Sequence, residues 1–133
     1  MSDQTILIID DDLMIRDMLY DFFLEKGFSV IAADTGQSAL EYIGNRDFDA
    51  AIVDVKLPEA DGLSVVRELM SKKPNTPVIV VTGYPTEDIR DEAYRLGAVA
   101  FMEKPFKVTR MAATIKKAIS AKESVEFTKS RVI

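Results

Sequence analysis

The chain has 133 residues, of which 47% are hydrophobic, with 22 acidic against 17 basic side chains, a net charge of −5, and neither cysteine nor histidine. This length suits one domain with its own core, and the composition excludes disulfides, thiolate metal sites, imidazole catalysis and a phosphohistidine on this chain. The sequence contains no cluster of Lys and Arg of the kind that binds nucleic acid, and no apolar run long enough to span a membrane. The polar N-terminal residues are unlike a secretory signal. We therefore expect a cytoplasmic protein.

Five apolar runs predict β-strands at residues 5–9, 28–33, 50–53, 78–81 and 99–102. Several are apolar at consecutive positions, which is typical of strands that are buried on both faces of a parallel sheet. Apolar residues at helical spacing lie between these strands and after the last one, at 15–22, 40–43, 65–69, 89–96 and 108–119. Gly27 and Gly97 lie where helix C-caps are expected, and Gly44 follows the second helical pattern.

The strict alternation of strands and helices predicts an α/β fold. Parallel strands need crossover connections, and right-handed crossovers place helices on both faces of the sheet. We therefore expect a doubly wound five-stranded parallel sheet, in a domain that covers residues 1–122. The polar segment 123–133 loses the helical periodicity, and we interpret it as a C-terminal extension or the start of a linker.

Polar side chains follow four of the predicted strands. Asp10 and Asp11 come after the first strand, Asp54 after the third, Thr82 after the fourth and Lys104 after the fifth. Because chemistry collects at the carboxyl ends of the strands in open α/β sheets, we expect these five side chains to lie at one edge.

Clustered carboxylates need a cation beside them. Carboxylates about 4 Å apart repel by about 4 kcal/mol at an effective dielectric constant of about 20, so three of them cost on the order of 10 kcal/mol. An oxygen-only ligand set favours a hard divalent ion, Mg²⁺ or Mn²⁺, and Lys104 can supply further positive charge. Taken singly, Asp54, Thr82 and Lys104 are also compatible with a turn, a strand end and a loop. Asp12 is expected to cap the first helix.

The chain resembles a response-regulator receiver domain of two-component signalling over about residues 5–121. The resemblance rests on the acid pair Asp10 and Asp11, the stretch DVKLPEADG with Asp54, Pro58 and Gly62, then Thr82, Phe101, Lys104 and Pro105. It implies a flavodoxin-like fold with strand order 2-1-3-4-5 and phosphorylation of Asp54. It also implies that Asp10, Asp11, Asp54 and the backbone carbonyl of Lys56 hold the metal ion.

The implied reaction needs a partner protein, since this chain has no histidine. The phosphohistidine donor then belongs to a sensor histidine kinase or a histidine phosphotransfer protein, and a downstream output protein or domain reads the result. Transfer to a carboxylate depends mainly on positioning and charge neutralisation. The metal ion, the Lys104 ammonium and the Thr82 hydroxyl are each expected to contact a phosphoryl oxygen.

Two further hypotheses concern the phosphorylated state. If the Thr82 hydroxyl moves inward, Phe101 gains room to change rotamer and alter the nearby surface; the alternative is that Phe101 only packs in the core. Lys56 and Tyr84 lie two residues after Asp54 and Thr82, and we expect them to shield the acyl phosphate from water and slow its hydrolysis. The alternative is that both side chains point into solvent.

Two other functions are also compatible with these residues. The spacing of Asp10 and Asp12 after a buried strand is found in aspartate-nucleophile phosphatases of the haloacid dehalogenase type, in which they would be nucleophile and acid. Such enzymes need another acid pair after the lysine, and residues 105–120 contain none. A degenerate receiver that acts only as a binding module is the second alternative. We favour a phosphoacceptor signalling domain that assists its own phosphorylation and dephosphorylation over a conventional enzyme.

Overall fold

The computed structural model describes the backbone of residues 4–131 and the side chains of residues 4–124. At its centre is a five-stranded parallel sheet with the order β2-β1-β3-β6-β7. The strands are β1 (Thr5–Ile9), β2 (Ser29–Ala33), β3 (Ala50–Asp54), β6 (Val78–Thr82) and β7 (Ala100–Glu103). Counted among these five alone, the order is 2-1-3-4-5, which confirms the predicted flavodoxin-like α/β fold.

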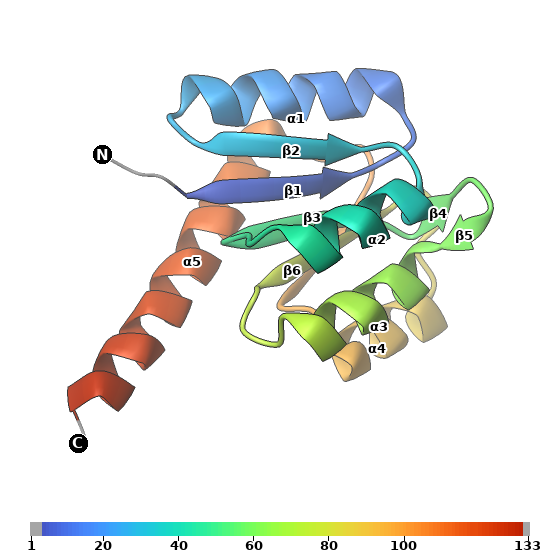
Figure 1. Ribbon diagram of the computed structural model, residues 1–133. Coiled ribbons are helices and arrows are strands. Elements are labelled where there is room, and N and C mark those ends of the chain that lie inside the picture. The colour runs from blue at the N-terminus through green and yellow to red at the C-terminus, as the bar shows by residue number, and fades with distance from the viewer. Residues whose placement is uncertain (1–3, 132–133) are drawn as a thin grey trace.

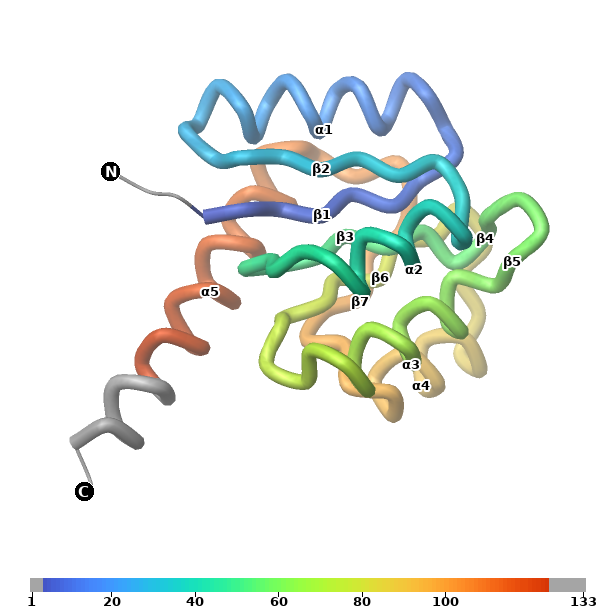
Figure 2. The backbone as a smooth tube through the Cα atoms, in the orientation of Figure 1, coloured from blue at the N-terminus to red at the C-terminus, as the bar shows by residue number. Residues whose placement is uncertain are grey.

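Five helices connect the strands and cover the sheet (Figure 1). They are α1 (Leu13–Glu25), α2 (Gly36–Asn45), α3 (Gly62–Lys72), α4 (Glu87–Leu96) and α5 (Val108–Arg131). The backbone tube in Figure 2 shows α1 above the sheet and α5 passing behind it, and these two helices cover one face while α2, α3 and α4 cover the other.

Alternate residues of the central strands face two separate cores. On β1, Leu7 and Ile9 pack with residues of α2, α3 and α4, whereas Ile6 and Ile8 pack with residues of α1 and α5. Strands β3 and β6 are buried along their whole length. This double burial explains the runs of consecutive apolar residues, because neither face of these strands meets water.

The start of α1 follows a local signal. The Asp12 side chain accepts hydrogen bonds from the backbone N–H groups of Met14 and Ile15, at 3.0 and 3.2 Å. These bonds satisfy two of the free donors in the first turn of the helix. The predicted capping role of Asp12 is therefore confirmed.

Glycines mark the ends of two helices but not of a third. Gly97 is the C-cap of α4 with φ of 114°, and Gly27 follows the last turn of α1 with φ of 93°. Both have the left-handed backbone that glycine adopts without a steric penalty. Gly44 lies inside α2, which ends one residue later.

The last helix extends beyond residues 108–119, over which its apolar residues repeat at helical spacing. Helix α5 runs to Arg131, so the backbone of most of the segment 123–133 is helical. The domain boundary at residue 122 and the role of this segment as an extension or linker stay predictions. In the part of the chain that the structure describes, no helix is both long and apolar enough to cross a membrane.

A short hairpin directly after β3 was not predicted. It pairs β4 (Lys56–Leu57) with β5 (Ala60–Asp61) in antiparallel fashion, and strands of two residues are too short to show a hydrophobic period. The hairpin ends at Gly62, whose N–H donates to the carbonyl of Val55 at 2.6 Å. A Cβ at Gly62 would lie 1.9 Å from the carbonyl oxygen of Asp54. Only glycine therefore permits this close approach to the end of β3.

We expect Gly62→Ala to lower the free energy of unfolding by about 2–3 kcal/mol, because the added methyl group must displace the backbone of β3. Gly44→Ala is the matched control, since a Cβ at Gly44 would meet nothing within 4 Å. It should change stability by less than about 1 kcal/mol and in the stabilising direction. Urea unfolding followed by far-UV circular dichroism measures both variants, and equal losses would contradict the close-approach argument.

Candidate functional site

The predicted site residues meet at the carboxyl edge of the sheet. Asp10 directly follows β1, Asp54 ends β3, Thr82 ends β6 and Lys104 directly follows β7. One carboxylate oxygen from each of Asp10, Asp11 and Asp54 lies within 4.8 Å of the other two. The structure therefore brings together the acids that the sequence placed at this edge.

The three carboxylates differ in burial and in how they are held. Asp10 is 0% exposed and Asp54 is 4% exposed, whereas Asp11 is exposed to solvent. Asp10 Oδ1 accepts a hydrogen bond of 2.9 Å from the backbone N–H of Asp12, and Asp54 Oδ1 accepts one of 3.2 Å from that of Lys56. Backbone donors thus orient the two buried carboxylates, and one oxygen of each remains for other contacts.

Lys104 supplies the positive charge at the site. Its Nζ lies 2.9 Å from Asp10 Oδ2 and 2.9 Å from Asp54 Oδ2. The contact with Asp54 is a hydrogen bond. The contact with Asp10 is an ion pair without hydrogen-bond geometry, so Asp10 Oδ2 is buried with no hydrogen bond to the described residues. A cis peptide bond joins Lys104 to Pro105.

The charges at the site shift each other's protonation. Burial raises the pKa of the Asp10 carboxyl and the charge of Asp54 adds to this, while the Lys104 ammonium and the Asp12 N–H oppose it. Burial also pulls the pKa of Lys104 down, but its contacts with the two carboxylates outweigh burial and raise the pKa of Lys104 above its usual value. Lys104 therefore stays protonated at neutral pH.

The donor set fits a hard divalent cation. Three carboxylates contribute oxygen ligands within a small space, and a single ammonium offsets only one of their charges. Oxygen ligands of this kind suit Mg²⁺, Mn²⁺ and Ca²⁺. The part of the Lys56 backbone carbonyl in this set stays a prediction.

Thr82 is held from two sides. It is 2% exposed, its Oγ1 accepts a hydrogen bond of 3.1 Å from the Tyr84 N–H, and its carbonyl accepts one of 2.8 Å from the Lys104 N–H. A hydroxyl that accepts through a lone pair still has its own proton to donate. The loops after β6 and β7 therefore hold Thr82 with a donor available at the edge of the sheet.

Lys56 on β4 and Tyr84 in the loop after β6 lie beside the site. The Lys56 Nζ is 5.2 Å from the centroid of the Tyr84 ring, a cation–π contact. Both side chains and Thr82 border one hollow in the surface. Tyr84 is 72% exposed, so the ring lies at the outer margin of this hollow.

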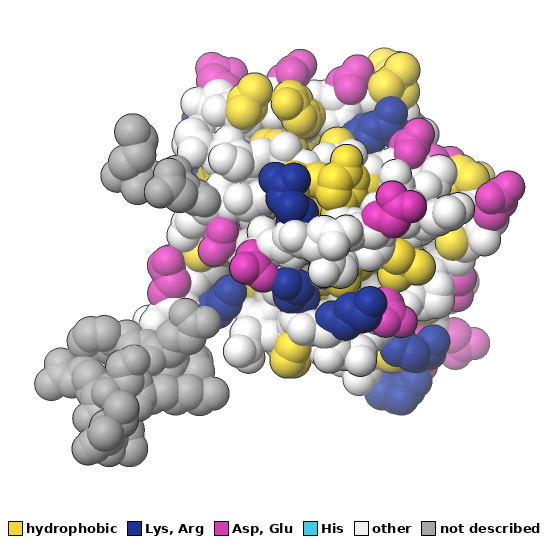
Figure 3. All heavy atoms as spheres, viewed as in Figure 1, with side chains coloured by type: hydrophobic (Ala, Val, Ile, Leu, Met, Phe, Trp, Pro, Cys, Tyr) yellow, Lys and Arg dark blue, Asp and Glu magenta, His cyan; other side chains and the backbone are white. Residues whose placement is uncertain are grey.

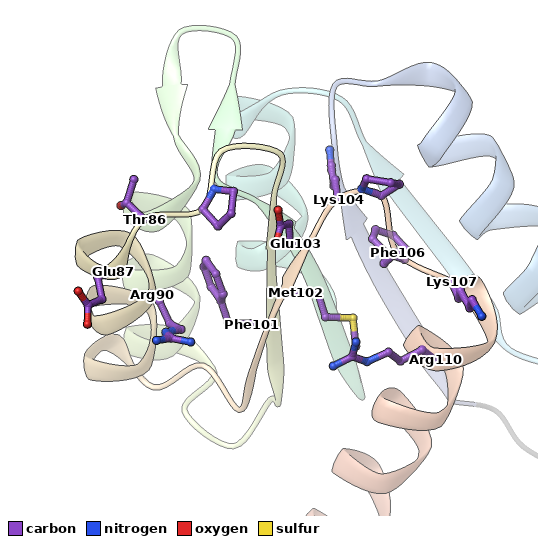
Figure 4. Close-up of a pocket in the computed structure, with 12 residues that line it drawn as sticks. Thr86, Glu87, Arg90, Phe101, Met102, Glu103, Lys104, Phe106, Lys107 and Arg110 are labelled. Atoms are coloured by element: carbon purple, nitrogen blue, oxygen red, sulfur yellow. The ribbon is translucent and has the colours of Figure 1, made fainter.

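Phe101 lies on β7 between the site and α4. It is half-buried and packs against the core on the side of α2, α3 and α4. Figure 4 shows its ring between α4 and the end of the sheet, in a pocket that Lys104 also borders. The packing of Phe101 is thus established, whereas its predicted change of rotamer stays a prediction.

Two features of the site have no signal in the sequence pattern. Arg16 Nη1 donates a hydrogen bond of 2.9 Å to the carbonyl of Asp10, which ties α1 to the loop that carries the acid pair. The hairpin that ends at Gly62 supports Asp54 from the other side. Neither contact follows from the periodicity or spacing of residues, because each depends on how a loop folds back.

A family model and individual relatives identify the same protein family for this chain. Residues 6–116 match the response regulator receiver domain. Sporulation initiation phosphotransferase F of Bacillus subtilis is 30% identical over 124 residues, which cover 93% of this chain and 100% of that protein. Transcriptional regulatory protein FixJ of Bradyrhizobium diazoefficiens is 34% identical over 118 residues, 89% of this chain and 58% of that protein.

Other relatives are much longer than this chain. Transcriptional regulatory protein ZraR of Escherichia coli is 31% identical over 121 residues, which cover 91% of this chain but 27% of that protein. The chain thus spans about a quarter of ZraR and somewhat more than half of FixJ.

Solved structures share the fold over nearly the whole chain. The receiver domain protein from Methanospirillum hungatei superposes with a TM-score of 0.90 at 30% identity, covering 92% of this chain and 98% of that one. A response regulator from Burkholderia pseudomallei, solved with a phosphorylated aspartic acid, a calcium ion and citrate, has a TM-score of 0.82 at 27% identity, covering 96% of this chain and 75% of that one.

The ion pairs of Lys104 generate a pH-dependent prediction. In metal-free buffer at neutral pH, Lys104→Gln should lower the free energy of unfolding by about 3 kcal/mol, because it leaves two buried carboxylates without their cation. A carboxyl whose pKa is raised on folding carries a penalty that is complete above the folded pKa and disappears below the unfolded pKa. Since the pKa of Asp10 is raised, the loss should shrink as the pH falls.

Lys107→Gln is the control, because Lys107 is exposed and forms no ion pair with the described residues. Urea unfolding with a chelator present compares each of the two variants with the wild type, at neutral and at mildly acidic pH. A loss for Lys104→Gln that is equal at both pH values would show that Asp10 does not carry the penalty.

Proposed function

The chain belongs to the response regulator receiver domain family, and on this basis we propose that Asp54 accepts a phosphoryl group from a phosphohistidine. Members of this family are signalling modules of two-component phosphorelays rather than classical enzymes. The observation that carries the proposal is the position of Lys104, whose ammonium lies 2.9 Å from Asp54 Oδ2 within a cluster of three carboxylates. This arrangement offers a carboxylate nucleophile beside a fixed positive charge.

In the proposed reaction a carboxylate oxygen of Asp54 attacks the phosphorus atom. The new P–O bond forms an acyl phosphate, the P–N bond to the donor histidine breaks, and its electron pair returns to the imidazole. Lys104 neutralises charge on a phosphoryl oxygen, and the Thr82 hydroxyl donates a hydrogen bond to another. Asp10, Asp11, Asp54 and the Lys56 carbonyl would hold Mg²⁺ or Mn²⁺, which would supply further charge neutralisation.

The partner follows from the composition of the chain. Because the protein has no histidine, the donor is a sensor histidine kinase or a histidine phosphotransfer protein. The phosphorylated aspartic acid and calcium ion of the related Burkholderia pseudomallei protein support a phosphorylated, cation-bound state of the same fold. An output protein or domain that recognises this state completes the proposed pathway.

The proposed readout involves Thr82 and Phe101. The Thr82 hydroxyl is available as a donor, and the two loops that hold it border the pocket in which Phe101 lies. Movement of this hydroxyl toward a phosphoryl group would change the space beside the Phe101 ring. The surface formed by α4, β7 and α5 would then differ between the two states.

Lys56 and Tyr84 are proposed to control how long the phosphoryl group persists. Their cation–π contact places two large side chains over one side of the hollow that Thr82 borders. Hydrolysis needs a water molecule in line with the leaving carboxylate oxygen. Side chains that exclude or misalign this water slow the loss of phosphate by about tenfold for each 1.4 kcal/mol added to the barrier.

The phosphatase alternative is disfavoured by the position of Asp12. This mechanism needs Asp12 as an acid, but its side chain accepts two hydrogen bonds at the start of α1. It also leaves Asp54 without a role, although Lys104 contacts Asp54 as closely as it contacts Asp10.

The first test is phosphorylation by a small phosphodonor, such as acetyl phosphate, with Mg²⁺. We expect the wild type to gain one phosphoryl group at Asp54 and Asp54→Asn to gain none, as measured by intact-protein mass spectrometry and peptide mapping. Asp61→Asn is the control, because the Asp61 side chain caps α3 through the Leu63 N–H and asparagine caps equally well. Labelling at Asp10 in Asp54→Asn would favour the phosphatase, and an unlabelled wild type would favour a binding module.

The second test concerns the metal ligands. Asp11→Asn should weaken Mg²⁺ binding by about tenfold or more, because it removes one of few charged ligands of a hard cation. Asp12→Asn removes the same charge one residue away but keeps the helix cap, so its affinity should stay close to that of the wild type. Isothermal titration calorimetry measures both. Equal affinities of the two variants would contradict the assignment of Asp11.

A further inference from the structure

A groove at the edge of the sheet opposite Asp54 is independent of the proposed phosphorylation site. Its walls come from the end of α3, the loops that lead into β6 and β7, and the middle of α5. Apolar side chains form most of the surface, including Met70, Pro77, Val99 and Ala118. We call it the α5 groove. Val99 is 52% exposed, so this apolar surface faces solvent.

The charged residues of the α5 groove are all basic. Lys117 and Lys122 of α5 border it, and no acidic side chain does. Neither lysine forms an ion pair with the residues that the structure describes. Asp47, which feels the charge of Lys122, is paired with Lys73 at 2.6 Å. In a chain with a net charge of −5, this groove is a basic and apolar surface whose two lysines form no ion pair with the described residues.

The outer face of α1 has the complementary character. Met14 is 82% exposed and Met18 is 41% exposed. Asp17 and Asp21 lie on the same face, are exposed and form no ion pair with described residues. Figure 3 shows acidic and hydrophobic side chains side by side along the part of the surface that α1 forms in Figure 1.

The two surfaces have complementary charge and share apolar character. Asp17 and Asp21 lie one helical turn apart on the same face of α1, and Lys117 and Lys122 both border the α5 groove, so each surface offers two charges of opposite sign to the other. Unbranched methionine side chains adapt to irregular apolar surfaces, so Met14 and Met18 suit the floor of the groove. We propose that the outer face of α1 of one copy docks into the α5 groove of a second copy.

This contact joins two different surfaces, so the association is head-to-tail. It buries one helix face in one groove, a small interface that is typical of transient assemblies. Helix α1 begins immediately after the acid pair, so a docked copy lies beside the approach to Asp54. Self-association therefore competes with any large phosphodonor for access to the site, whereas a small phosphodonor is less obstructed.

Sedimentation equilibrium of the 133-residue chain, from micromolar to millimolar concentration, tests the proposal. We expect the weight-average mass of the wild type to rise above 14.8 kDa as the concentration increases. The pair Lys117→Glu and Lys122→Glu, and separately the pair Asp17→Lys and Asp21→Lys, should each weaken association by about tenfold or more. An equimolar mixture of the two double variants should associate again, because it restores opposite charges across the contact.

Lys107→Glu with Lys116→Glu is the matched control, since it makes the same charge change at two exposed lysines outside the groove. It should associate like the wild type. Met14→Lys replaces an apolar side chain by a positive charge. Because Met14 is 82% exposed, the fold should tolerate the change, but the new charge would face the basic groove, so association should weaken. Far-UV circular dichroism verifies the fold of each variant.

Three results would overturn the proposal. They are a wild type that stays monomeric over the whole concentration range, a control pair that loses association as much as the groove pair, and a mixture of the two reversed variants that stays monomeric.

Discussion

The burial of two like charges at one edge of the sheet is the constraint on which the rest of this structure depends. Asp10 and Asp54 are almost inaccessible to water, and an unpaired buried carboxylate is costly. Lys104 makes the arrangement possible, because its single ammonium contacts an oxygen of each. The remaining oxygens accept backbone hydrogen bonds from Asp12 and Lys56, so the loops after β1 and β3 are shaped by the same need.

The same electrostatics explain why the site can be stable and receptive at once. One ammonium offsets one of three carboxylate charges, which is sufficient to hold the two buried acids but leaves excess negative charge with exposed Asp11 at its margin. A divalent cation bound there would offset the two remaining charges, so that an anionic phosphoryl group would no longer meet a net negative site. The family to which the chain belongs works through such a transfer, in which the protein contributes mainly position and charge.

Much of this arrangement could be predicted from the sequence. Consecutive apolar residues in β3 and β6 reflect burial on both faces, and the carboxyl ends of parallel strands meet at one edge, so Asp10, Asp54 and Thr82 could be placed together. The contacts that form where loops fold back on the strands could not be predicted from the sequence. The steric need for Gly62 and the hydrogen bond from Arg16 to the Asp10 carbonyl depend on local geometry that has no periodicity.

The double contact of Lys104 also has an entropic consequence. A free lysine side chain samples many rotamers, and fixing it costs about 1.5–2 kcal/mol. Here both carboxylates hold the Lys104 ammonium in the folded chain, so this loss of rotational freedom occurs during folding. If Asp54 accepts a phosphoryl group as proposed, that group would meet an ammonium that is already ordered, and the free energy of their contact would not be reduced by the cost of restraining a mobile side chain.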